Sequence, residues 1–251
     1  MRTALLAAIC LVLSAQSATI VIRGPNAAAG SVAGGGGGSC GGSAPTFDAA
    51  SEVAAPGNGV ATISWSHTCT GADGLLCVFI GQGVTGGTPV TINSVTYNGD
   101  ALTKLTGYAS SFNFCHVDMW YRVAPDTGGS FTIEITAASA VDQLVGSAIS
   151  LANVCASTSF GTPVPATGTA SPATTTVTSA ATELVVGCLF TDDNAGIAVT
   201  TGTERFEIED IESDTSWSGL TATGAASVSP AWSIDSAPQD WACSAVSVKG
   251  K

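Results

Sequence analysis

Segments in which hydrophobic and polar residues alternate recur along the chain from about residue 46 onward. Val60–Ser66 reads VATISWS, Val117–Val123 reads VDMWYRV and Phe131–Ile135 reads FTIEI. Alternation with a period of two is typical of a strand with one buried face. Leu75–Ile80 and Glu183–Phe190 are short apolar runs of strand length. No stretch has a convincing helical period, so the pattern predicts an all-β protein.

Turn residues separate these segments. Asn98-Gly99 stands between Val95–Tyr97 and Ala101–Thr103. An Asn-Gly pair between two strands predicts a hairpin, because a type I′ turn needs positive φ at both central residues. The sequence APDTGG at 124–129 is a second cluster of turn residues, directly after the strand that ends at Val123.

The order of the strand segments repeats at an offset of roughly 100 residues. The paired segments are 74–80 with 183–190, 90–104 with 198–207, 117–123 with 217–223, 131–135 with 228–234, and 144–151 with 241–248. The similarity lies in pattern rather than identity, so it indicates either an internal duplication or the general monotony of β-rich sequence. We expect about ten strands in two packed antiparallel sheets, a jelly-roll-like β-sandwich that spans residues 46–251.

The first 45 residues have a different character. Arg2, the apolar run Leu5–Leu13 and the small residues Ala15 and Ser17 predict a secretory signal peptide over 1–17. The competing interpretation is a retained hydrophobic arm, as in some virion proteins. Residues 18–45 read as a Gly-rich stem, which behaves as a flexible linker. Beyond residue 17 no apolar run approaches the ~20 residues that a membrane span requires.

Few residues are charged, and most of these are acidic. The chain has 10% charged residues and a formal net charge of −12. An acidic surface repels a phosphate backbone, so we expect no nucleic-acid partner. The simplest interpretation of the acidity is solubility.

Eight cysteines are present, and none forms a CxxC pair or has a histidine at metal-ligand spacing, which argues against zinc. In an exported protein one to three disulfides are expected. Cys77, Cys188 and Cys243 lie inside apolar strand runs, which favours buried thiols. Cys69 and Cys115 are the best candidates for a bridge.

Candidate catalytic groups are few. The two histidines, His67 and His116, stand near strand ends and could be neighbours across a sheet, but no serine lies in a GxSxG motif. Six acids crowd into 204–214. A run along one strand or loop does not place two carboxylates across a cleft, so it indicates a solvated strand edge rather than a glycosidase site.

Calcium is the one cofactor that the sequence suggests. Asp192, Asp193 and Asn194, followed by Gly196, are rich in oxygen ligands and typical of a turn. A hard cation prefers such ligands, although the spacing is not that of an EF-hand loop.

Five tryptophans complete the set of candidate binding residues. Trp65 and Trp120 alternate with apolar partners, which favours the core. Trp217, Trp232 and Trp241 stand nearer to Ser, Pro and Asp residues. If they were exposed they could stack on a sugar ring, and the alternative is again core packing.

Two motifs in the first half resemble a known group of domains. They are VTYNGDALTKL at 95–105 and MWYRVAP at 119–125, accompanied by Trp65-Ser66-His67 and LLCVFI at 75–80. The block is similar to uncharacterised, jelly-roll-like β-sandwich domains of bacterial extracellular proteins and phage structural proteins, over roughly 55–155 with a weaker continuation to 250. The resemblance implies a structural or adhesive role at a surface.

We therefore expect a non-enzymatic, surface-displayed structural or adhesive module, a component of an extracellular assembly or a virion. Its partners would be proteins, through self-association or assembly into a larger surface structure. The alternative is a secreted carbohydrate-binding module, assisted by calcium, whose partner is a glycan. A signal peptide would place the protein outside the cell or on its surface, and a retained arm would place it on a virion.

Overall fold

The computed structural model describes residues 40–55, 59–84, 86, 88–109, 114–192, 196–211 and 215–251, which belong to one compact unit. The expected signal peptide over 1–17 and most of the stem over 18–45 lie outside the described residues. The regular secondary structure of the described part is β-strand throughout, which confirms the all-β class. No helix long and apolar enough to cross a membrane occurs among these residues.

The described residues form 17 strands, against the ten expected. They are β1 (Thr46–Ala54), β2 (Val60–Thr68), β3 (Leu75–Gly83), β4 (Ile92–Tyr97), β5 (Asp100–Ala101), β6 (Thr103–Ala109), β7 (Cys115–Val123), β8 (Ser130–Val141), β9 (Gln143–Ala152), β10 (Val164–Gly168), β11 (Ala173–Thr174), β12 (Glu183–Thr191), β13 (Ile197–Thr201), β14 (Thr203–Ile211), β15 (Thr215–Thr223), β16 (Ala231–Ile234) and β17 (Trp241–Lys249).

The strands form four antiparallel sheets. The first inner sheet has the order β1-β9-β3-β7-β6, and the first outer sheet has the order β2-β8-β4-β5. The second inner sheet has the order β10-β17-β12-β15-β14, and the second outer sheet has the order β11-β16-β13. Replacing each strand of β1-β9-β3-β7-β6 by its counterpart in the second half of the chain yields the order of the second inner sheet. The connectivity is therefore duplicated, in repeat 1 (β1 to β9) and repeat 2 (β10 to β17).

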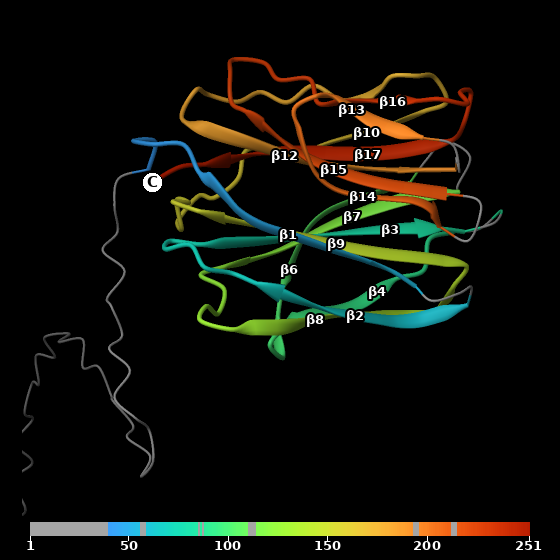
Figure 1. The fold of residues 1–251 in the computed structure, drawn as a ribbon, viewed down its shortest axis with the longest axis horizontal. Coiled ribbons are helices and arrows are strands. Elements are labelled where there is room, and N and C mark those ends of the chain that lie inside the picture. The colour runs from blue at the N-terminus through green and yellow to red at the C-terminus, as the bar shows by residue number, and fades with distance from the viewer. Residues whose placement is uncertain are drawn as a thin grey trace, which may run out of the picture. The chain divides into compact units, whose positions relative to one another are not determined.

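The four sheets stack as four layers, with the two inner sheets face to face in the middle (Figure 1). A central core lies between the inner sheets, and a separate core lies between each inner sheet and its outer sheet. Each inner sheet is thus covered on both faces, so β3 is buried at every position. This explains why residues 75–80 read as an apolar run without alternation. Each repeat forms its own sandwich, where we expected two sheets in all.

The two repeats pack on each other with approximate two-fold symmetry. β1 of repeat 1 lies against β14, while its counterpart β10 lies against β6. β9 lies against β14 in the same way as β17 lies against β6. The same surface of each repeat therefore meets the other, as in an isologous dimer interface. Hydrogen bonds cross it: Trp217 Nε1 in β15 donates to Ser147 Oγ in β9 at 3.1 Å, and Cys115 Sγ in β7 donates to the carbonyl of Asp240, just before β17, at 3.3 Å.

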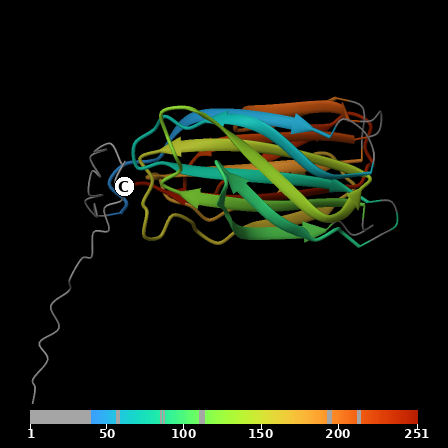
Figure 2. The same cartoon turned by 90° about the horizontal axis from the view of Figure 1, so that it is seen from below.

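The beginning and the end of the described chain are fastened together at one end of the body (Figures 1 and 2). The backbone N–H of Gly41 donates to the carbonyl of Gly250 at 2.8 Å, and that of Ser43 donates to the carbonyl of Lys251 at 2.9 Å. Lys251 Nζ also pairs with Asp73 Oδ2 at 2.7 Å. A side chain on Gly250 would collide with the backbone of Ser43, so this close approach requires glycine.

A disulfide between Cys40 and Cys155 closes the same end. The expected bridge between Cys69 and Cys115 is wrong, since both are free and buried. Cys69 lies in the first outer core and Cys115 in the central core, so the first inner sheet separates them. The free, buried thiols expected at 77, 188 and 243 are confirmed. Burial raises the pKa of Cys77 to about 12, which keeps this thiol unreactive.

Candidate functional site

The Asn98-Gly99 turn joins β4 to β5 as a hairpin, as predicted. Asn98 has φ 53° and Gly99 has φ 82°, so both central residues adopt the positive φ that this turn requires. The turn carries the first of the two motifs at the edge of the first outer sheet. The second motif runs along β7 of the first inner sheet and into the turn before β8.

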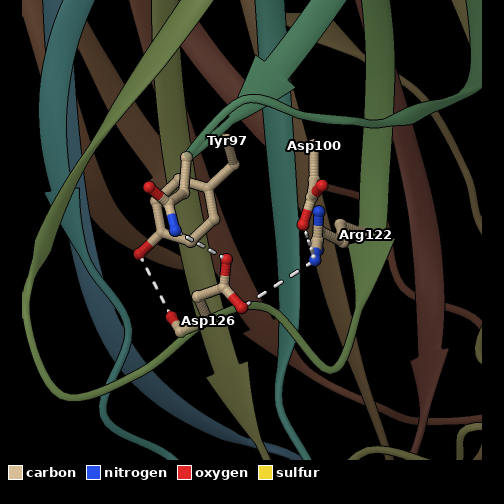
Figure 3. A network of polar contacts seen from close by, with 5 residues as sticks. Tyr97, Asp100, Arg122 and Asp126 are labelled. Carbon is tan, nitrogen blue, oxygen red and sulfur yellow. Dashed lines mark hydrogen bonds and ion pairs between the residues drawn. The ribbon is translucent and has the colours of Figure 1, made fainter. Parts of the chain in front are cut away.

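The two motifs meet in one polar network (Figure 3). Tyr97 Oη donates to the carbonyl oxygen of Asp126 at 3.3 Å, and Asn98 Nδ2 donates to Asp126 Oδ2 at 3.1 Å. The Tyr97 side chain is fully buried, and burial raises the pKa of its hydroxyl above the ordinary range. These bonds attach the hairpin of the outer sheet to the turn that follows the inner strand β7.

Arg122 extends this network along β7. Its Nη2 lies 2.6 Å from Asp100 Oδ2 in the hairpin and 3.9 Å from Asp126 Oδ1. A guanidinium between two carboxylates satisfies both and adds a second link between the sheets. The residues of the two motifs therefore hold the first outer sheet on the first inner sheet, which is a structural role.

A second polar cluster joins β1 to β2 and contains one of the two histidines. Ser51 Oγ lies 2.7 Å from His67 Nδ1 and accepts a hydrogen bond of 2.9 Å from Trp65 Nε1. The Ser51 hydroxyl has one proton and two lone pairs, so besides accepting from the indole it can either donate to Nδ1 or accept from it, according to the tautomer of the imidazole. Nε2 is buried and has no partner among the described residues. His67 is 2% exposed, so this serine–histidine pair is a packed contact between the two strands.

The other histidine is buried in a different sheet. His116 lies in β7 of the first inner sheet and His67 in β2 of the first outer sheet. They are therefore not neighbours across a sheet, although the sequence had allowed that arrangement.

Stability is expected to fall as the pH is lowered from 6.5 to about 4, by about 3 kcal/mol from His67 alone. Burial lowers the pKa of His67 to about 4, although the nearby charge of Asp48 opposes the shift. Between these two values the unfolded chain binds a proton that the folded chain rejects, so acid favours unfolding. Urea titrations at several pH values would measure the slope.

The His67→Asn variant is the control for this slope. Subtracting its pH profile from that of the wild type cancels other acids, including Glu207, whose raised pKa acts in the opposite direction. Equal slopes in the two proteins would contradict the assignment.

Asp48 forms a third cluster at a bulge in β1. Its carboxylate accepts hydrogen bonds from Thr70 N at 2.9 Å, from the Thr70 hydroxyl and from Ser150 Oγ at 2.8 Å. Burial alone would raise the pKa of Asp48, but the hydrogen bonds from Thr70 and Ser150 outweigh it and lower the pKa. The carboxylate thus stays ionised and fixes the end of β9 to the loop before β3.

The part of the acidic run up to residue 211 lies on β14, an edge strand of the second inner sheet, as expected for a strand edge, while Glu212 and Asp214 lie outside the described residues. Burial and the charges of Glu204 and Glu209 raise the pKa of Glu207 to about 7. Glu209 Oε1 accepts a hydrogen bond of 3.3 Å from the backbone N–H of Ile197 in β13. Crowded carboxylates on an edge oppose pairing with a further strand.

The candidate calcium ligands are described only in part. Asp192 directly follows β12 and is half-buried, while Asp193 and Asn194 lie outside the described residues. Among the residues that are described, no group of three or more His, Cys, Asp or Glu side chains could hold a metal ion. Calcium at this turn stays a prediction.

The tryptophans proposed for sugar stacking are buried, so that proposal is wrong. Trp217 and Trp232 are 0% exposed and Trp241 is 6% exposed. Trp217 lies in the central core, and the other two lie in the second outer core. Each indole N–H has an internal acceptor, namely Ser147 Oγ, Ser218 Oγ and the Ala170 carbonyl. Ser and Pro neighbours in sequence did not indicate exposure, because both faces of the second inner sheet, which carries Trp217 and Trp241, are covered, and Trp232 in β16 packs into the second outer core.

Comparison with protein-family models, curated proteins and solved structures found no match to this chain. The roles of the polar clusters described above are therefore inferred from their geometry. They join one sheet to another, and their side chains are engaged mainly with each other.

Proposed function

We propose that this protein is a non-enzymatic structural or adhesive module displayed on a surface, as a component of an extracellular assembly or a virion. The observation that carries the proposal is that the beginning and the end of the described chain meet at one end of the four-layer body (Figure 2). A body attached to a larger structure through this end would leave its outer sheets and its far end available for contacts with other proteins.

The disulfide supports the proposed location. Structural disulfides persist in oxidising compartments and at virion or cell surfaces, and are rare in the cytosol. The Cys40–Cys155 bridge joins the segment before β1 to the segment between the two repeats. It therefore fastens the segment before β1 to the body.

The duplicated architecture supports a role in assembly. The two sandwiches bury equivalent faces against each other, so their outer sheets face outward on opposite sides of the body (Figure 1). Two similar outward surfaces on one chain allow contacts with two neighbours. We therefore propose protein partners, through self-association or incorporation into a larger surface structure.

The location is tested on the source cells or particles. A membrane-impermeant amine label applied to the intact material should reach this protein, and mass spectrometry should find the native N-terminus at Ala18 after export or at Met1 in a virion. A protein protected from the label until lysis would contradict display at a surface.

Assembly is tested with the purified chain by sedimentation velocity over a wide concentration range. We expect species larger than the 24.7 kDa monomer that grow with concentration. A monomer at every concentration, together with specific glycan binding on an array, would favour the carbohydrate-binding alternative.

A further inference from the structure

Repeat 2 contains a polar cavity of about 390 Å³ at the end of the second inner sheet. Its lining includes Ser247 and Lys249 from β17 and Glu183 from the start of β12. Three threonines, Thr162, Thr176 and Thr178, contribute hydroxyl-bearing side chains. The volume is that of a small-molecule site, and the lining is unusually polar for one.

The symmetry of the two repeats identifies the counterpart of Ser247. In repeat 1, Ser150 of β9 stands opposite Leu76 of β3, and in repeat 2 Ser247 of β17 stands opposite Val185 of β12. The ends of the strands agree with this alignment. The carbonyl of Gly74, two residues before Leu76, accepts from Ala124 N–H. The carbonyl of Glu183, two residues before Val185, accepts from Gly224 N–H.

The two serines have different partners. Ser150 Oγ donates to the carboxylate of Asp48, a half-buried acid of repeat 1. Ser247 is 1% exposed, and its Oγ has no hydrogen-bond partner among the described residues. The segment of repeat 2 that runs beside Ser247 contains Gly161 and Thr162 in place of an acid. The backbone N–H of Gly161 donates to the Ser247 carbonyl. A side chain on Gly161 would collide with Ser247 Oγ, so the glycine allows the hydroxyl to pack against the backbone at this position.

A buried hydroxyl without a partner costs free energy, which a ligand oxygen would recover. The charges around the cavity indicate which oxygen it would be. Lys249 makes no ion pair within the described part of the chain, although Glu183 is its partner in the β12–β17 ladder. Glu183 is engaged elsewhere, since its Oε2 accepts from Ala180 N–H at 3.2 Å. The ammonium of Lys249 is therefore available to an anion.

We propose that this cavity binds a small carboxylate compound whose body carries hydroxyl groups. One carboxylate oxygen accepts from Ser247 Oγ, as Asp48 does from Ser150, and the carboxylate pairs with Lys249 Nζ. The threonine hydroxyls bind the hydroxyl groups of the ligand. Repeat 1 carries the corresponding carboxylate in its own chain, and repeat 2 takes it from solution.

The test is a titration of the ¹⁵N-labelled full chain with glucuronate, with glucose as the matched neutral probe. Glucuronate should shift the amide signals of residues 161, 247 and 249, and glucose should shift them at least tenfold less at equal concentration. Lys249→Met should weaken glucuronate binding about tenfold. No shift with glucuronate, equal shifts with both sugars, or unchanged affinity in Lys249→Met would each overturn the proposal.

Two serine variants separate ligand binding from a structural role. Ser247→Ala should abolish the shifts without lowering the melting temperature, because the hydroxyl has no internal partner to lose. Ser150→Ala should lower the melting temperature, because it removes a bond to Asp48, and should leave glucuronate binding unchanged. A lower melting temperature in Ser247→Ala, with binding retained, would assign the hydroxyl to the fold instead.

Discussion

Replacing both Cys40 and Cys155 with serine is expected to lower the free energy of unfolding by about 4 kcal/mol. The disulfide joins residues that are 115 apart in sequence, and a cross-link that closes so long a loop removes much conformational entropy from the unfolded chain. It also fastens the segment before β1 to the segment between the two repeats. Urea unfolding, followed by tryptophan fluorescence, would measure the change.

A reductant provides the control for this effect. It should move the unfolding midpoint of the wild type toward that of the double variant and leave the variant unchanged. Alkylation of unfolded, unreduced protein should modify the five cysteines that are free in the described part of the chain and spare Cys40 and Cys155. Protection of Cys69 and Cys115 in that experiment would instead support the bridge between them that was expected from the sequence.

Trp217→Ala is expected to lower the free energy of unfolding by about 4 kcal/mol. The indole is fully buried between the inner sheets, stacked on Phe206 with ring centroids 5.7 Å apart and 6.0 Å from the Phe190 ring. Truncation leaves a cavity in the central core and deprives Ser147 of its hydrogen bond. Chemical denaturation of the two proteins would give the difference.

Two further variants separate the contributions at this position. Trp217→Phe keeps an aromatic ring in the core and loses the hydrogen bond, so a loss of about 1–2 kcal/mol is expected. Trp65→Ala removes a half-buried indole outside the central core and should cost less than Trp217→Ala. A Trp217→Ala protein as stable as the wild type would mean that the indole is not part of the core.

Local signals in the sequence identified the strands that are long or that end in a marked turn. The hairpin at Asn98-Gly99 was predicted because its φ requirement is met by two adjacent residues. β5 and β11 have two residues each, too few to show a period of their own. The repeated order of segments was visible, but whether it meant duplication depended on pairing between distant strands.

The buried polar groups were harder to predict. An alternating pattern shows which residues share a face, and it does not show what covers that face. Trp217 lies on one face of the second inner sheet and Trp241 on the other, and both are buried because a further sheet packs on each side. The contrast between Ser150 and Ser247 is likewise absent from their local sequence, since it depends on Asp48 and Gly161, which precede them by many residues.

The sequence by itself determined the all-β class, the Asn98-Gly99 hairpin and the order of the repeated strand segments, because strand and turn formation depend on neighbouring residues. Only the tertiary structure decided that each repeat closes its own sandwich, that Cys40 pairs with Cys155, and that a cavity opens beside Ser247. These features depend on contacts between segments that are far apart in the sequence, as the 115-residue separation of the disulfide illustrates. Such contacts follow from how the sheets stack.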